Sequence, residues 1–239
     1  MLQLSLCVSG IKKEMLDSFR QELKVYITNK RGSFSVYEKD DFLYYLIAAQ
    51  NEEKTGIEKV LKQKIAQLII NSFKLKMVEN SLKYEFMHDV KYYALVEALV
   101  NFDRACDEMY IMQKLDFSSG ELYLQSFYYF CCGILREKWM QLIQITNQNS
   151  HFLDVQENYL EVLRFLLDGI DKKPAINIEV KNNKLKVKKD GEIILFANYK
   201  ELISYIIKNN PKSIRLKNVD KTFAEFIKQL FLTRVTLSM

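Results

Sequence analysis

The sequence contains few residues that interrupt regular structure. Only two prolines and seven glycines occur in 239 residues, which argues against a fibrous or disordered chain. Its four cysteines form no CxxC pair. Because disulfide frameworks belong to oxidising compartments, we expect reduced thiols and a cytoplasmic protein.

Long apolar runs are also missing. The most apolar uncharged segment, residues 122–135, has 14 residues, whereas a membrane-spanning helix needs about 20. The opening residues, MLQLSLCV, carry no basic charge before their apolar run, so we expect no signal peptide. We therefore predict no transmembrane segment.

The motifs that mark common active sites do not occur. The chain has no GxGxxG, GxxxxGK[ST], HExxH or GxSxG pattern, which removes the usual nucleotide-binding, metalloprotease and hydrolase interpretations. Its two histidines, His88 and His151, have no neighbours at ligand spacing, so a zinc site is not expected. We predict no cofactor, no metal ion and no catalytic residue.

What the sequence does have is a large apolar fraction and an uneven charge. Apolar residues make up 49% of the chain, enough to bury the core of one large domain or two small ones. The net charge is +5. Residues 172–239 hold 15 lysines and arginines against 6 acids, a net of +9, and residues 1–171 hold 20 against 24, a net of −4. The basic end is therefore the part suited to an acidic partner.

Residues 1–50 are predicted to form a small α/β segment. Alternating apolar residues indicate a strand over residues 2–8, and apolar residues at helical spacing from Ile11 indicate a helix of about three turns. Extended runs are predicted at residues 25–28, 33–38 and 42–48.

Residues 51–171 are predicted to be helical. One helix is centred near Leu61, and a long helix without glycine or proline runs over about residues 85–112. The tract over residues 121–146 is the most apolar and is predicted as the central helix of a bundle. Residues 145–151 are predicted as a polar connection.

An amphipathic helix over residues 156–170 closes this region. Gly169 and Pro174 stand where a helix should end and be prevented from resuming. Its apolar face consists of Tyr159, Leu160, Leu163, Leu166, Leu167 and Ile170.

A β meander is predicted over residues 176–196. With Asn182-Asn183 as a two-residue turn, Ile178 faces Val187 and Glu179 faces Lys186, so one face is apolar and the other polar. A three-residue loop over residues 189–191 would then pair Lys188 with Glu192. The third strand, EIILF, is apolar on both faces, and we expect its second side to be covered.

The last residues are predicted to form a βαβ tail. Asn198 and Glu201 form a capping box that starts a helix ending at Asn210-Pro211. The strand SIRLKN, a helix over residues 221–232 and the strand RVTLS follow, and parallel strands are the default for this order.

The predicted fold class is therefore α+β. It comprises an N-terminal small α/β segment (residues 1–50), a central helical bundle (residues 51–171) and a basic C-terminal β meander plus βαβ tail (residues 172–239).

The C-terminal half resembles a known family. The order ENYLEVLRFLLDGIDKKPAINIEV, a hairpin ending in EIILF, ISYIIKNNPKSIRLKN and FIKQLFLTRVTLS is similar to the YtxC-like family of sporulation proteins. The similarity covers roughly residues 125–239, and Cys131-Cys132-Gly133 replaces a basic run of that family. The matching positions are Phe127, Phe130, Tyr159, Val162, Leu163, Leu166, Pro211, Ile214, Phe231, Arg234 and Val235. The resemblance implies a role in sporulation and brings no catalytic residue.

Acidic and cysteine residues offer two candidate sites. Asp103, Asp107 and Glu108 would bring carboxylates together on one helix, for a cation or for acid-base work, although a solvated helix face is the prevailing interpretation. Cys131 and Cys132 could bind soft metals or sense oxidants, but their apolar neighbours favour burial in the core.

Lysines form the sharpest surface feature. Strand alternation would place Lys184, Lys186 and Lys188 on one side of a strand, beside Lys189. Such a face could bind nucleic acid, acidic lipid or an acidic protein. It could equally be an edge strand that lysines guard against aggregation, and that interpretation prevails. The 29 tyrosines and phenylalanines could offer a stacking platform for single-stranded nucleic acid, but most are predicted to be core.

Three functions follow from these features. The leading prediction is a sporulation-associated cytosolic protein that acts through protein partners without catalysis. The alternative is an anion-binding module, for nucleic acid or an acidic membrane surface, that uses the lysine face. An enzyme of unrecognised type ranks third.

Overall fold

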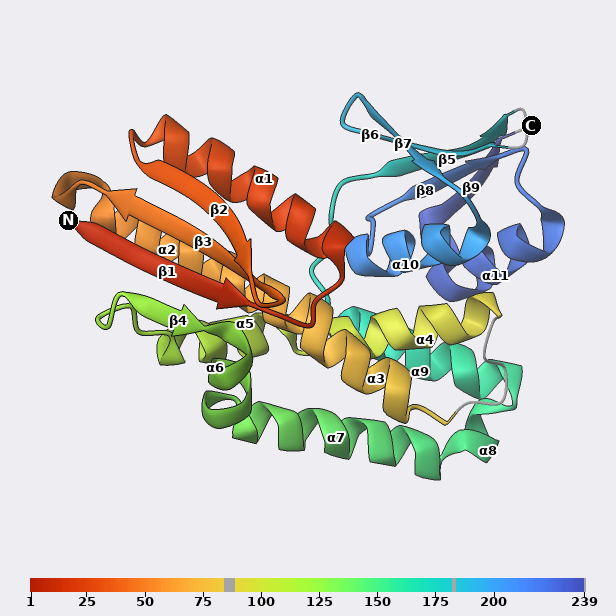
Figure 1. Ribbon diagram of the computed structural model, residues 1–239. Helices are drawn as coiled ribbons and strands as arrows, with labels where there is room; N and C mark the ends of the chain where they lie inside the picture. The colour runs from red at the N-terminus through yellow and green to blue at the C-terminus, as the bar shows by residue number, and fades with distance from the viewer. Residues whose placement is uncertain (84–88, 182–183, 239) are drawn as a thin grey trace. The chain divides into compact units, whose positions relative to one another are not determined.

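The computed structural model describes residues 1–83, 89–181 and 184–238 (Figure 1). The fold is mixed α+β, as predicted, with strands at the N-terminus, helices in the centre, and strands and helices at the C-terminus. Residue contacts divide the chain into two compact units. The N-terminal unit comprises residues 1–77 and 104–141, and the C-terminal unit comprises residues 78–103 and 142–239. Residues 51–171 are therefore shared between the two units.

The N-terminal unit is built on a four-stranded sheet of order β2-β3-β1-β4. β1 (Leu2–Val8) pairs antiparallel with β3 (Phe42–Ala49) and parallel with β4 (Glu121–Tyr123), and β2 (Ser33–Lys39) lies at the edge.

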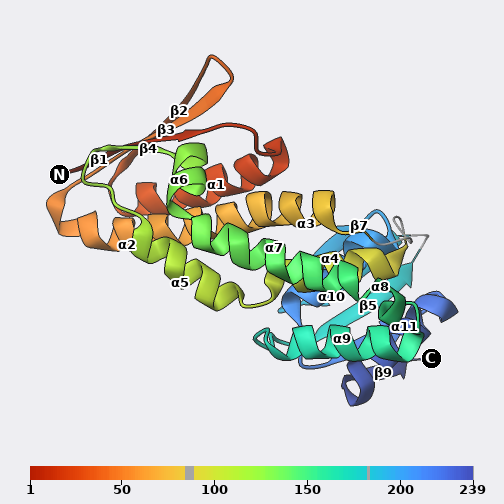
Figure 2. The ribbon, with the colours of Figure 1, turned by 90° about the horizontal axis from the view of Figure 1, so that it is seen from below.

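Helices α1 (Lys13–Asn29) and α2 (Asn51–Ile69) cover one face of this sheet (Figure 2). The covered face is apolar, and Phe19 of α1 meets Tyr45 of β3 edge to face, with ring centroids 5.4 Å apart. On the opposite face most of the described residues are exposed or half-buried, although Cys7 is buried.

The remaining helices of the N-terminal unit follow α2. A π-helical turn, Ile70–Lys74, leads from α2 into α3 (Leu75–Ser81), and α5 (Arg104–Lys114) packs on α2. α6 (Leu124–Cys131) follows β4, and α7 (Gly133–Gln148) comes next. The division between the two units falls within α3 and α7.

The C-terminal unit is built on a five-stranded sheet of order β7-β6-β5-β8-β9. β5 (Ile176–Lys181), β6 (Lys184–Lys189) and β7 (Glu192–Phe196) form an antiparallel meander. β8 (Ile214–Lys217) and β9 (Val235–Ser238) extend it in parallel, as predicted for the tail.

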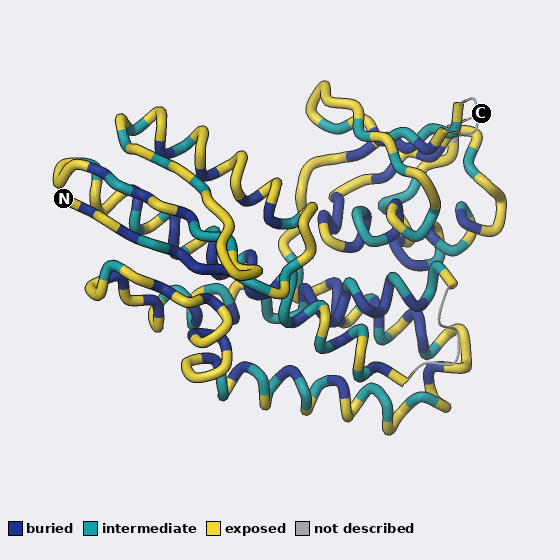
Figure 3. The backbone as a smooth tube through the Cα atoms, in the orientation of Figure 1, coloured by how far each residue is buried: buried dark blue, intermediate teal, exposed yellow. Residues whose placement is uncertain are grey.

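Helices cover one face of this sheet, and in the part of the unit that the structure describes no helix lies on the other face (Figure 1). α10 (Tyr199–Asn209) and α11 (Lys221–Phe231, followed by a 3-10 turn at Leu232–Arg234) lie against the sheet. α4 (Val90–Asn101) and α9 (Gln156–Asp168) pack on these helices in turn, and the short α8 (Ser150–Leu153) precedes α9. The strands alternate between buried and exposed residues, which marks the covered and open faces (Figure 3).

The first hairpin of the meander has the predicted register. Ile178 pairs with Val187, Glu179 with Lys186 and Val180 with Leu185. The turn predicted at Asn182-Asn183 lies outside the described residues.

The second hairpin differs from its prediction. Lys189, rather than Lys188, pairs with Glu192, because the loop has two residues. Asp190 (φ 50°) and Gly191 (φ 86°) both lie in the left-handed region, which a tight two-residue hairpin turn of this twist requires.

Helix ends in the C-terminal unit follow their sequence signals. α9 ends at Gly169, and the side chain of Asn198 caps α10 by accepting a hydrogen bond of 2.9 Å from Glu201 N. Glu201 in turn accepts from Ala197 N at 3.1 Å, so the reciprocal bond of the predicted capping box goes to the residue before the N-cap and not to Asn198 itself.

Three predictions about the helical tracts are wrong. Residues 25–28, predicted as extended, belong to α1. The helix predicted over residues 85–112 is interrupted at Phe102 and Asp103, where Asp103 has φ 54°, and its first residues lie outside the described part. Residues 145–151 are largely helical instead of a polar connection.

The apolar tract over residues 121–146 is also not one helix. Its first three residues form β4, because β1 offers them an unpaired edge, and Cys132 ends α6 before α7 begins. A three-residue strand has no period that a sequence pattern could reveal.

Candidate polyanion-binding face

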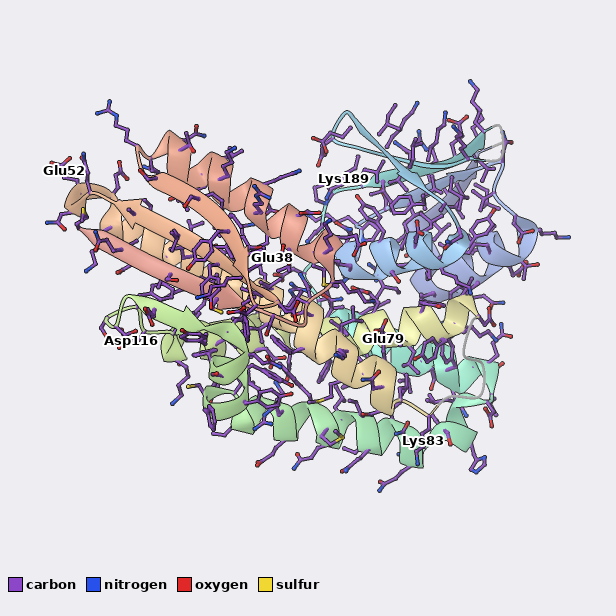
Figure 4. The ribbon with its side chains drawn as sticks, in the orientation of Figure 1. Glu38, Glu52, Glu79, Lys83, Asp116 and Lys189 are labelled. Carbon is purple, nitrogen blue, oxygen red and sulfur yellow. The ribbon has the colours of Figure 1, made fainter. Side chains whose placement is uncertain are left out.

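Three of the four lysines predicted as a site lie together. Leu185 and Val187 are buried against the helices, so Lys184, Lys186 and Lys188 project from the open face of β6. Lys189 comes next in sequence and falls on the helix-covered side, where its Nζ donates to Asn209 Oδ1 at 3.3 Å (Figure 4). Lys189 is therefore not part of the open face.

Neighbouring strands add cations that the sequence pattern did not single out. Lys181 on β5 pairs with Lys184, and Arg215 and Lys217 on β8 pair with Asn177 and Glu179 of β5. Paired residues share a face, so these side chains project beside the lysines of β6. We call the following six residues the basic face: Lys181, Lys184, Lys186, Lys188, Arg215 and Lys217.

The basic face has little internal neutralisation. Glu179 is the one acid among the described residues that the strand registers place within this face. Within the described residues, none of the six cations has a carboxylate within the 4.0 Å of a salt bridge. Strands about 4.8 Å apart, with same-face residues about 7 Å apart along each strand, set the cations in a regular grid. Such a grid can contact several phosphates at once.

The interpretation of these lysines as guards of an edge strand is wrong. β6 lies inside the sheet, hydrogen-bonded to β5 on one side and β7 on the other. Its backbone groups are therefore paired on both sides and need no protection from other strands. The edges of the sheet are β7 and β9.

Two aliphatic side chains border the basic face. Ile193 and Leu195 of β7 pair with Lys188 and Lys186, and they are 59% and 57% exposed. The expectation that a second layer covers this side of β7 is wrong, since α10 and α11 both lie on the other face.

The acidic candidates are not gathered on one helix face. Asp103 has φ 54° and precedes α5, so it does not share a helical turn with Asp107. Glu108 pairs with Arg104, whose Nε lies 2.7 Å from Glu108 Oε1. Asp107 is fully buried, which contradicts the prediction of a solvated face.

Asp107 is the centre of a buried ion cluster in the N-terminal unit. It accepts hydrogen bonds from Lys74 Nζ at 2.8 Å, Lys138 Nζ at 2.9 Å and Trp139 Nε1 at 2.8 Å. The Lys74 side chain is 1% exposed, and burial lowers its pKa although Asp107 opposes that shift. Lys74 and Asp107 have almost no exposed surface, whereas the Lys138 side chain is 38% exposed, so the central ion pair of the cluster lies away from solvent.

Helical spacing held a signal for this cluster. Asp107 lies four residues before the buried Ile111, and Lys74 lies four residues before the buried Val78. Trp139 lies four residues after the buried Leu135. Each residue therefore belongs to the buried face of its helix, and charged residues on such a face are expected to be paired.

The cysteines differ in their surroundings. All four are free, with Cys106 and Cys131 exposed and Cys7 and Cys132 buried. Cys131 and Cys132 are not two positions of one continuous helix, since Cys132 ends α6. Burial raises the pKa of Cys132 to about 12.

In residues 1–83, 89–181 and 184–238, no three His, Cys, Asp or Glu side chains come close enough to share a metal ion. His151 is almost fully exposed and lies 3.8 Å from Asp154, and His88 lies outside the described residues. In the described part of the chain, no helix combines the length and apolar character needed to traverse a bilayer.

Comparisons with protein-family models, with curated proteins and with solved structures find no match to this chain. The resemblance over residues 125–239 therefore stays a prediction, and the basic face is the feature on which function can be argued.

Proposed function

We propose that this protein is a non-catalytic binding protein whose C-terminal unit holds phosphate-bearing polyanions on the basic face. The observation that carries this proposal is that six cations, with one acid among them, project from a sheet face free of helices of the same unit. Phosphate contacts of this kind release counterions, position a protein and carry no sequence information. Binding is therefore expected to be weak, non-specific and strongly dependent on salt.

The test removes three lysines from the open side of β6. The variant Lys184→Gln/Lys186→Gln/Lys188→Gln leaves Leu185 and Val187 in place, so the sheet should stay folded. Its matched control is Lys208→Gln/Lys212→Gln/Lys228→Gln, which changes the net charge equally at exposed lysines outside the basic face. Each protein is titrated onto duplex DNA at about 50 mM and about 200 mM salt.

Counterion release sets the expected sizes. For the wild type, six phosphate contacts predict a loss of about 10³-fold in affinity between the two salt concentrations. For the variant that lacks the three lysines of β6, the three remaining contacts predict a loss of about 40-fold. The control should keep the wild-type salt dependence. If the two triple variants bind alike, or if the wild type binds nothing at low salt, the basic face has no polyanion-binding role.

Nucleic acid and anionic lipid share the phosphate chemistry, so the assay has a vesicle arm. The exposed Ile193 and Leu195 beside the lysines favour a membrane surface as the second candidate, because aliphatic side chains can enter the lipid interface. Ile193→Ser/Leu195→Ser should weaken binding to anionic vesicles and leave DNA binding unchanged if lipid is the ligand.

For the biological setting we propose a cytosolic role in sporulation, exerted through protein partners. Its support is the resemblance of residues 125–239 to the YtxC-like family, including Pro211, Arg234 and Val235. Deleting the gene in an endospore-forming host should reduce the yield of heat-resistant spores. A normal yield and normal resistance would remove the sporulation role and leave the binding proposal standing.

A further inference from the structure

The open face of the N-terminal sheet carries a row of tyrosines. Tyr37 of β2 pairs with Tyr44 of β3, Tyr44 pairs with Cys7 of β1, and Cys7 pairs with Tyr123 of β4. Paired residues share a face, so the three tyrosines lie in one row that crosses all four strands. Tyr37 is 45% exposed and Tyr123 is 47% exposed. Sequence periodicity could not reveal this row, because its members come from strands far apart in the chain.

The row is held in a defined geometry. The rings of Tyr37 and Tyr44 are stacked, with centroids 4.8 Å apart and planes 4° apart. Tyr44 is half-buried beside the buried Cys7, and Tyr37, which is 45% exposed, stacks on it. A ligand that stacks here would not have to order these side chains first.

A hollow of about 350 Å³ lies beside the row on the same face. The hollow exists because several of the residues that line it, serines, an alanine and a glycine, have small side chains. The lining side chains that can form hydrogen bonds are Gln3, Ser5, Ser33, Ser35 and Glu121. Ser5 and Ser35 both pair with Leu46, two residues along β3 from Tyr44. Flat rings and small polar groups are therefore adjacent.

We infer that this face stacks the bases of single-stranded nucleic acid. Tyrosine rings stack on nucleobases of any sequence, and serine, glutamine and glutamate side chains can hydrogen-bond to exposed base edges. A duplex cannot use the row, because its bases are already stacked within the helix. The inference goes beyond the proposed function, because it assigns the bases of a strand to a face of the N-terminal unit.

The charge of the tyrosine face favours uncharged groups over phosphate. The described polar groups around the hollow include Glu121 and no lysine or arginine. A phosphate would find no cationic partner among these groups, whereas an uncharged base could hydrogen-bond to them. The tyrosine face is therefore suited to bases and not to phosphate.

The test separates bases from phosphates. Binding is measured by fluorescence anisotropy with labelled oligo(dT) of about 20 nucleotides, longer than a typical single-strand site of roughly 4–16 nucleotides. An abasic strand of the same length keeps the phosphates and lacks the bases, and a duplex of that length keeps the bases out of reach. Wild-type protein should bind oligo(dT) more tightly than the abasic strand or the duplex.

Two variants then test the tyrosines. Tyr37→Ala/Tyr123→Ala should weaken oligo(dT) binding by roughly 5- to 150-fold for each stacked base that is lost, and should leave the abasic strand unaffected. Tyr37→Phe/Tyr123→Phe keeps the aromatic rings and should retain oligo(dT) binding. Phe130→Ala, at a residue 87% exposed on α6, is the matched control. A thermal melt confirms that each variant is folded, and if the double alanine variant unfolds, the single variants Tyr37→Ala and Tyr123→Ala take its place.

The outcomes distinguish this inference from the proposed function. Equal binding of oligo(dT) and the abasic strand by wild type, or wild-type affinity in the folded alanine variants, overturns the tyrosine platform. If binding to the abasic strand still weakens with salt and with the Lys184, Lys186 and Lys188 substitutions, the basic face stands alone. If oligo(dT) is preferred but neither salt nor those substitutions matter, the platform stands and the basic face fails.

Discussion

Lys74 Nζ lies 2.8 Å from Asp107 Oδ2, and the side chains of both residues are almost completely buried. Lys138 Nζ also contacts Asp107 at 2.9 Å, and the indole N–H of Trp139 donates to it. A buried pair of this kind stabilises little compared with apolar residues, but removing one partner strands the other charge in the interior.

Asp107→Ala should therefore destabilise the protein by about 3–5 kcal/mol, because Lys74 would lose its carboxylate. Glu108→Ala is the matched control on the same helix, where the part-buried pair of Glu108 with Arg104 keeps about a fifth of each side chain exposed, and its loss should cost less, about 1 kcal/mol. Urea denaturation of both variants measures the difference. Equal losses would show that the fully buried pair is no more important than the part-buried pair.

The same lysine predicts a pH dependence. Burial lowers the pKa of Lys74 below its ordinary value of 10.5, with Lys138 and Arg104 adding to the shift and Asp107 opposing it. In the interval between the lowered pKa and 10.5 the unfolded chain binds more protons at this site, so stability from this site rises with pH. The free energy of unfolding of wild type minus that of Lys74→Met should therefore increase as the pH rises toward 10.5. A flat or falling difference would contradict the lowered pKa.

Asn210 joins three parts of the C-terminal unit. It ends α10 at φ 37°, its amide donates to Leu167 O at 3.0 Å and Ile170 O at 2.7 Å, and its Oδ1 accepts from Arg234 Nη1 at 2.8 Å. Asn210→Gly keeps the left-handed backbone and loses these bonds, for a cost of about 1–3 kcal/mol. Asn210→Ala should cost about 1–2 kcal/mol more, because alanine disfavours positive φ. Denaturant midpoints of the two variants test the order, and equal midpoints would contradict it.

Leu163 tests the placement of α9. It is completely buried, so Leu163→Asp would put a charge into an apolar contact and should cost several kcal/mol. Phe165→Asp is the control on the same helix, at a residue 68% exposed. If Leu163→Asp melts within about a degree or two of wild type, the assignment of this helix face is wrong.

The cysteines should react at different rates. At about pH 8, Cys106 and Cys131 should label with a thiol reagent within the native protein, because both are exposed. Cys132, buried and with its pKa raised to about 12, should label only after denaturation, as should the buried Cys7. Mass spectrometry of labelled peptides measures this, and equal labelling of Cys131 and Cys132 would show that Cys132 is accessible.

The sequence by itself determined the features that rest on local periodicity and local capping. The pairing of Ile178 with Val187 and the apolar stripe of α9 follow from alternation and helical spacing within a few residues of chain. The capping box at Asn198 is local in the same way, since its partner lies three residues away.

Tertiary structure decided everything that depends on which distant segments meet. β4 exists because residues 121–123 find the edge of β1, and Arg215 joins the lysines because β8 pairs with β5. β6 is an inner strand because β7 completes its second side, and Ile193 is exposed because both helices lie on one face. The periodicity of side chains along a strand or helix shows which residues share a face, but it does not show which elements lie beside it. The lysines of β6 could therefore be predicted from the sequence, whereas the cations of neighbouring strands and the row of tyrosines could not.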